Sequence, residues 1–166
     1  MTEPDDHDSR WTAFDTEQVN MAAMGVRHPL TTALAFMDAL GDPVANLELL
    51  GNLVTPESRT RWGDFSAAKA ALDAIDEPGY GSIVNRLPGA PDVGYFKILS
   101  GVSKGYEVTE ERAVMVPAVV TLVWRPEATA KFLPEPGMWL VHQIGDPAKP
   151  EDLSHIRTSP GDAPDY

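Results

Sequence analysis

The chain has 166 residues, with 25 acidic and 13 basic side chains, a formal net charge of −12 and no cysteine. This is the length of one domain that buries its own core, and the absence of cysteine excludes disulfides, iron–sulfur clusters, thiolate zinc ligands and a thiol nucleophile. Residues 1–17 carry a net charge of −5 and residues 150–166 carry −3, and no basic stripe exists to bind nucleic acid or an anionic membrane surface.

Both ends of the chain are polar and rich in acidic residues or proline. We expect residues 1–14 to form an acidic disordered tail, residues 15–146 a single folded domain, and residues 147–166 a proline-rich acidic tail whose Leu153–Ile156 segment can dock onto the body. The start lacks the basic and apolar regions of a signal peptide, and no apolar run has the length of a membrane span. A cytoplasmic protein is therefore expected.

The first half has the apolar spacing and the start and stop signals of helices. Asp15 begins a helix that ends near Gly25, and a second helix follows the Thr31-Thr32 pair and stops at Gly41. Two short helices begin with the pairs Asp42-Pro43 and Thr55-Pro56, where a capping residue precedes a first-turn proline. Asp64 or Ser66 opens the last helix, whose predicted buried face comprises Phe65, Ala68, Leu72 and Ile75.

The second half is rich in β-branched and aromatic residues separated by Pro, Gly and charges, which is typical of antiparallel strands. The predicted strands are 82–87, 94–100, 112–125 and 138–145. Residues 113–124 are apolar at nearly every position, so both faces of that strand must be covered. Pro117 cannot donate a ladder hydrogen bond and predicts a bulge or bend.

Helices followed by antiparallel strands are the α+β pattern, with the N-terminal helices packed on the sheet. The segments Leu53–Ser58 and Trp62–Phe65 between helices, and the closing strand Met138–Gly145, resemble the nuclear-transport-factor-like superfamily, which includes ketosteroid isomerases and polyketide cyclases. The resemblance covers residues 30–145 and rests on element order. It implies an α+β cone in which a strongly curved, mainly antiparallel sheet surrounds a pocket, and a homodimer formed through the outer sheet face.

The acid and base groups of a ketosteroid isomerase do not map onto this sequence residue by residue, so that mechanism is not carried over. His142 is the best candidate for a general base, because it alternates with the apolar Leu140 and Ile144 along a strand. Asp38 on the long helix and Asp64 are the candidate acids. The alternatives are a structural or interface histidine, a solvated helix carboxylate and a helix cap, respectively.

Aromatic side chains are the candidates for an apolar ligand site, with ordinary core packing as the alternative. They are Trp62, Tyr80, Tyr95, Phe96 and Trp139. Arg59 and Arg61 flank Trp62 and would either bind an anion or lie in solvent. The four histidines are scattered without metal-ligand spacing, and glycine-rich phosphate loops are absent, so no metal site and no cofactor is expected.

Ample hydrophobic surface without convergent polar groups favours a non-catalytic cone-fold protein that binds a small apolar ligand or a protein partner, as a homodimer. The alternative is a small isomerase, dehydratase or cyclase with a His/Asp acid–base pair in the cone. A fold of this kind does not by itself choose between the two functions.

Overall fold

The computed structural model describes residues 28–75, 78–84, 89–100, 118–129, 135–154 and 156, and within strand β1 and at Ser100 it describes the backbone alone. The helices in this part are α2 (Pro29–Ala39), α3 (Leu47–Leu53), α4 (Pro56–Trp62), α5 (Ser66–Asp73) and the short 3-10 helix η3 (Pro150–Asp152). The strands are β1 (Pro78–Val84), β2 (Val93–Ser100), β3 (Ala118–Arg125) and β4 (Met138–Gly145). The predicted helix 15–25, the tail 1–14 and Pro117 lie outside the described residues.

Helix α2 begins earlier than the Thr31-Thr32 pair suggests. His28 is its N-cap, with Nδ1 accepting a hydrogen bond of 3.1 Å from the backbone N–H of Leu30, and Pro29 occupies the first helical position. Thr32 instead faces inward and its Oγ1 donates to the carbonyl of Trp139 at 3.0 Å. The hydroxyl therefore joins the helix to β4 rather than capping it.

Of the two pairs predicted to begin short helices, Asp42-Pro43 and Thr55-Pro56, only the second does so. Thr55 caps α4 as predicted, with Oγ1 accepting from the backbone N–H of Ser58 at 3.3 Å. Asp42 accepts from the N–H of Ala45 at 3.1 Å and closes a turn, and α3 starts only at Leu47. The predicted face of α5 is confirmed, because Phe65, Ala68 and Ile75 are buried and Leu72 is partly buried.

The four strands form one antiparallel sheet in the order β1-β2-β3-β4, which confirms the α+β class. The strand predicted to start at Ser82 begins at Pro78, where Pro78 pairs with Ser100. Proline is tolerated there because β1 is an end strand in this order and needs no second set of ladder hydrogen bonds. Strand β4 has the predicted bounds, and the described part of the apolar 112–125 strand is β3.

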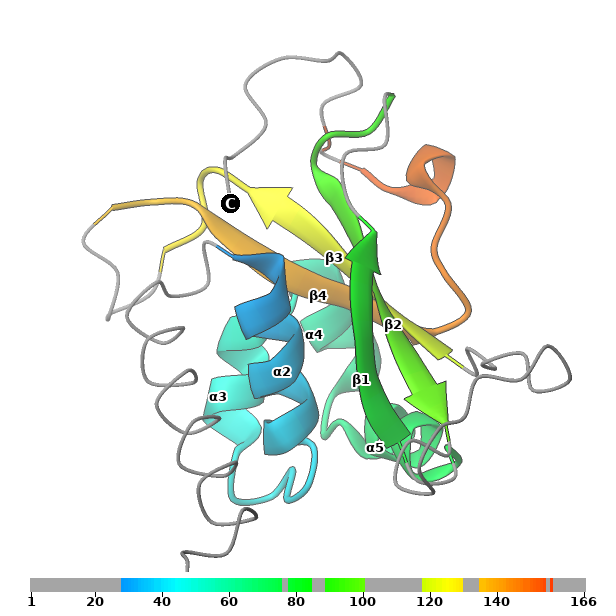
Figure 1. Ribbon diagram of the computed structural model, residues 1–166. Coiled ribbons are helices and arrows are strands. Elements are labelled where there is room, and N and C mark those ends of the chain that lie inside the picture. The colour runs from blue at the N-terminus through cyan, green and yellow to red at the C-terminus, as the bar shows by residue number, and fades with distance from the viewer. Residues whose placement is uncertain are drawn as a thin grey trace, which may run out of the picture.

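Helices pack on one face of the sheet (Figure 1), and the chain after β4 packs on part of the other. The space between helices and sheet is filled by fully buried side chains. The largest of them include Phe36, Phe65, Phe96 and Trp139. The ring of Trp62 stacks on that of Phe36 with centroids 5.6 Å apart and closes this core at α4.

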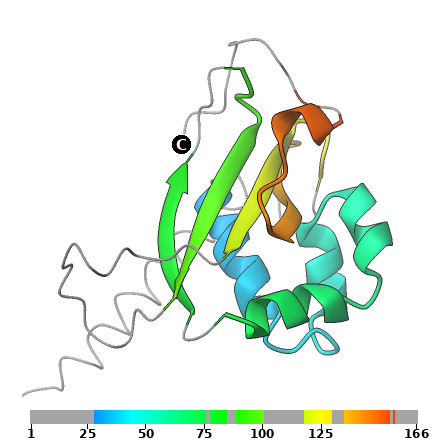
Figure 2. The ribbon, with the colours of Figure 1, turned by 90° about the vertical axis from the view of Figure 1, so that its right-hand side faces the viewer.

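The outer face of the sheet carries a second, smaller apolar cluster. Val93 of β2 and Val123 of β3 are fully buried there against Ala148 and Leu153. In Figure 2 the segment that contains η3 passes in front of β3, while α2 lies behind the strands. Around Val123 the second apolar face of β3 is therefore covered by the chain itself. Leu153 docks on the body, as the sequence suggested.

Candidate functional site

The candidate acids lie at the surface. Asp38 is exposed on α2. Asp64 is exposed between α4 and α5, and its Oδ1 accepts a hydrogen bond of 3.0 Å from the backbone N–H of Ser66. Hydrogen bonds from Ser66 hold the pKa of Asp64 below its usual value. Asp64 therefore has the local contacts of a capping residue, which was the alternative to a pocket acid.

His142 lies at a β-bulge, where the alternation used to predict its direction breaks down. In the β3–β4 register Gln143 pairs with Thr121 and Val141 pairs with Leu122, which leaves His142 as the extra residue. Leu140 therefore pairs with Val123 of the outer face, and Ile144 pairs with Val120 of the helix-facing core. Both apolar neighbours belong to the helix-facing core, but the bulge between them interrupts the two-residue alternation, so their spacing does not tell where the imidazole points.

The loop before α4 and its first turns hold this bulge at the free edge of β4. The backbone N–H of Thr55 donates to the carbonyl of Val141 at 2.9 Å. Ser58 Oγ and Arg61 Nη2 both donate to the carbonyl of His142. Carbonyls that an edge strand would leave unpaired are thus bonded, which blocks continuation of the sheet at this position.

The same hydroxyls determine the tautomer of His142. Thr55 Oγ1 donates its single proton to Ser58 Oγ at 2.9 Å, and it lies 3.2 Å from Nδ1 of His142. The hydroxyl therefore acts as acceptor toward the ring, which places a proton on Nδ1. The lone pair of the neutral imidazole is then on Nε2.

Burial is the main cause that lowers the pKa of His142, and the guanidinium of Arg61 adds to it. Glu57 opposes and Arg125 supports this shift, whereas neither Asp38 nor Asp64 is among its causes. Glu57 forms an ion pair with the buried Arg125 at 3.3 Å. Partial burial would raise the pKa of Glu57, but its own backbone N–H, Arg125 and Thr55 together lower it.

The described candidate aromatic residues are divided between the two faces of the sheet. Phe96 and Trp139 are fully buried in the helix-facing core, and Trp62 packs at its margin. Tyr95 lies on the outer face, and the side chain of Tyr80 lies outside the described residues. Arg61 is engaged with the carbonyl of His142 and lies 5.2 Å over the Trp62 ring, so its position is already accounted for without an anion.

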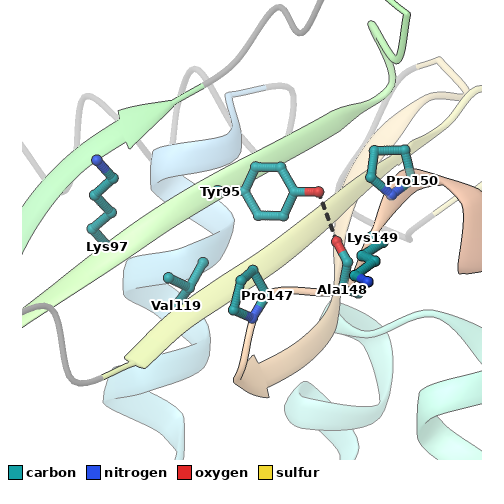
Figure 3. A pocket seen from close by; sticks show the side chains of 7 residues that line it. All are labelled: Tyr95, Lys97, Val119, Pro147, Ala148, Lys149 and Pro150. Atoms are coloured by element: carbon teal, nitrogen blue, oxygen red, sulfur yellow. Dashed lines mark hydrogen bonds between the residues drawn. The ribbon is translucent and has the colours of Figure 1, made fainter.

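A pocket of about 370 Å³ opens on the outer face, between β2, β3 and the chain that follows β4 (Figure 3). Its lining is almost entirely apolar. The lining residues are Tyr95, Lys97, Val119, Pro147, Ala148, Lys149 and Pro150. Tyr95 is the predicted aromatic residue that belongs to it. The lysines are on different elements, one in β2 and one just before η3.

Two side chains anchor the wall of this pocket to the sheet. Tyr95 Oη donates to the carbonyl of Ala148 at 2.6 Å, and Thr121 Oγ1 accepts from the N–H of Ala148 at 3.1 Å. Tyr95 and Thr121 are direct cross-strand neighbours. Burial, with a smaller effect of the Glu151 charge, raises the pKa of the Tyr95 phenol, so it stays a neutral donor well above neutral pH.

Sequence reasoning missed the residues that surround His142 and those that form the outer-face pocket. Thr55 was recognised as a cap, but its contact with His142 joins positions 87 residues apart. Pro147–Pro150 were assigned to a tail by composition, and nothing local shows that they form a pocket wall. A signal was present in Leu153, an apolar residue in an otherwise polar stretch.

The described residues include no group of three or more His, Asp or Glu side chains arranged to hold a metal ion. Within the same part of the chain, no helix combines the length and apolarity needed to cross a membrane. No family model matches the chain, and no curated protein and no solved structure matches it.

Proposed function

We propose that this is a non-catalytic binding protein and that its ligand occupies the outer-face pocket. The observation that carries the proposal is the contrast between the two faces of the sheet. The helix-facing side is filled by Phe36, Phe96 and Trp139, whereas the outer side has an apolar pocket of about 370 Å³. That volume is at the lower end of the range for small-molecule sites.

The lining favours a ligand with an apolar body. Val119 and Pro147 offer no hydrogen-bonding side chain, and the hydroxyl of Tyr95 is already used by Ala148. Lys97 and Lys149 are the charged groups of the lining. An apolar molecule with an anionic group would therefore be preferred over a neutral one of the same size.

The cone shape and the homodimer belong to the same proposal. The element order and the antiparallel sheet support a nuclear-transport-factor-like cone whose sheet is strongly curved. A homodimer would use the outer face, as the apolar β3 suggests. Because the chain after β4 already covers Val93 and Val123, the dimer contact would lie toward Lys97 and Val119 and would enclose the pocket that they line.

The dye 1-anilinonaphthalene-8-sulfonate has an apolar body and one negative charge, and is a suitable probe for the pocket. We expect saturable binding of one dye per chain to the wild type, and at least tenfold weaker binding to Val119→Trp, whose indole fills the pocket. Val44→Ser is the matched control, because Val44 is 91% exposed and lies away from the pocket. Equal loss in both variants, or none in Val119→Trp, would contradict the proposal.

An enzyme is the second candidate, and the orientation of His142 favours it. Thr55 directs Nδ1, which leaves Nε2 as a neutral base at pH 7, and Glu57 is the acid whose charge acts on His142, in place of Asp38 and Asp64. Deuterium uptake from D2O into a panel of enolisable ketones tests it. Uptake lost in His142→Ala at an unchanged melting temperature would support catalysis, whereas no uptake by the wild type, or a strongly lowered melting temperature, would count against it.

A further inference from the structure

The segment Pro147–Leu153 lies on the outer face as a docked peptide. Ala148 is 9% exposed and Leu153 is 8% exposed, and both pack against Val93 and Val123 of the sheet. Between them Lys149 and Glu151 point their charges to solvent, since both are exposed. A short stretch with two buried apolar residues and exposed charges between them is the pattern of a peptide ligand on a groove.

The sheet binds the backbone of this segment and not only its side chains. The N–H and the C=O of Ala148 are both held, one by Thr121 and the other by Tyr95. These donors and acceptors would bind any residue in this place that has a free N–H. The pair therefore recognises the backbone at this position, and the apolar groove selects the side chains around it.

Prolines give the segment its conformation. Pro147 and Pro150 are spaced as Pro-x-x-Pro, and Lys149 between them has φ −77° and ψ 142°, the values of a polyproline II helix. Both prolines line the pocket beside the Tyr95 ring (Figure 3). Proline-rich segments usually dock in grooves lined by aromatic side chains. Their backbone is already ordered, so it loses little conformational entropy on docking.

We propose that the outer face of β2 and β3 is a recognition site for a Pro-x-x-Pro segment whose second proline begins a 3-10 turn that is followed by an apolar residue, and that residues 147–153 occupy it in cis. A partner protein with a segment of this kind binds by displacing them. The inference rests on the proposed binding function, since the segment that the partner displaces forms one wall of the pocket. The cis segment is tethered directly to β4, so it competes at an effective concentration in the millimolar range.

The test uses the full chain and a fluorescent peptide with the sequence of residues 146–153. In Leu153→Ala the cis segment loses its apolar anchor, so we expect this variant to bind the peptide at least tenfold more tightly than the wild type does. Adding Tyr95→Phe to that variant should weaken binding about fivefold, since one hydrogen bond to the peptide backbone is lost. A control peptide with proline in place of Ala148 lacks the N–H that Thr121 accepts and should bind poorly.

Failure of a folded Leu153→Ala variant to bind the peptide, or equal binding of the control peptide, overturns the inference. If that variant does not fold, hydrogen exchange of the Ala148 amide in the wild type replaces it, since displacement by excess peptide must speed this exchange. An unchanged rate at several millimolar peptide overturns the inference as well. Dye binding at the pocket without peptide binding would refute the inference alone and leave the proposed function standing.

Discussion

Ser58 is fully buried in α4, and its Oγ takes part in several hydrogen bonds at the bulge. It donates to the carbonyl of His142 and accepts from Thr55 and Arg61. Ser58→Ala removes these three hydrogen bonds inside the fold, so we expect a loss of about 1–3 kcal/mol in the free energy of unfolding. Thr60→Ala is the control in the same helix, because Thr60 is exposed, and should cost less than about 0.5 kcal/mol by urea titration.

The histidines make stability depend on pH in a known direction. Burial lowers the pKa of His142 and of His28 in the folded protein below the value of 6.5 that an exposed histidine has. The unfolded chain then binds more protons below pH 6.5, so stability is highest above that pH and falls as the pH decreases toward 5. The pKa of Glu57 is also lowered in the folded protein. Its ionised form therefore stabilises the fold, and this stabilisation is lost only as the pH falls below 4.5.

Urea denaturation at pH 7.5 and 5.5 checks this dependence. We expect the wild type to be less stable at pH 5.5, and His142→Gln to lose less stability between the two values, because it lacks one of the described histidines whose pKa is lowered. If the stability of His142→Gln depends on pH as strongly as that of the wild type, His142 is not the cause of the dependence.

Among the elements, the start of β4 depends on a glycine. Gly137 has φ +116°, and a Cβ on it would lie 2.8 Å from the Trp124 ring. Gly145 at the other end of β4 has φ +118° with nothing within 4 Å of the same position. Gly145→Ala therefore adds only backbone strain, about 1–3 kcal/mol, whereas Gly137→Ala adds the steric clash to that strain.

Thermal melts of the two variants separate these effects. We expect Gly137→Ala to have the lower melting temperature, with a change in the near-UV signal of the Trp124 and Trp139 pair, whose rings lie 5.9 Å apart. Equal melting temperatures would mean that the ring moves aside without cost.

For the whole molecule, the proposed homodimer is the property to test first. Native mass spectrometry of the purified protein reports the number of chains and any retained small molecule together. We expect a dimer that Val119→Glu dissociates, because the charge would be placed in the uncovered part of the outer face. Val44→Glu on the exposed link before α3 should leave it intact. A wild-type monomer would remove the dimer from the proposal.

Local signals predicted much of the fold. Thr55-Pro56 began α4, the spacing from Phe65 to Ile75 gave the buried face of α5, and Met138–Gly145 formed a strand with those bounds. These features depend on capping, on the helical period and on β propensity, which act over a few residues. For this reason they can be recognised without knowing the neighbours in space.

The candidate site depended on contacts that no local pattern contains. A single extra residue in β4 interrupts the alternation around His142, so the spacing of Leu140 and Ile144 alone does not fix the direction of the imidazole. The amino-acid sequence by itself determined the helices, the strands and the apolar nature of both faces of β3. Only the tertiary structure decided which side chains pack between the helices and the sheet, and that Pro147–Leu153 cover part of the outer face, because packing and register join residues far apart in the chain.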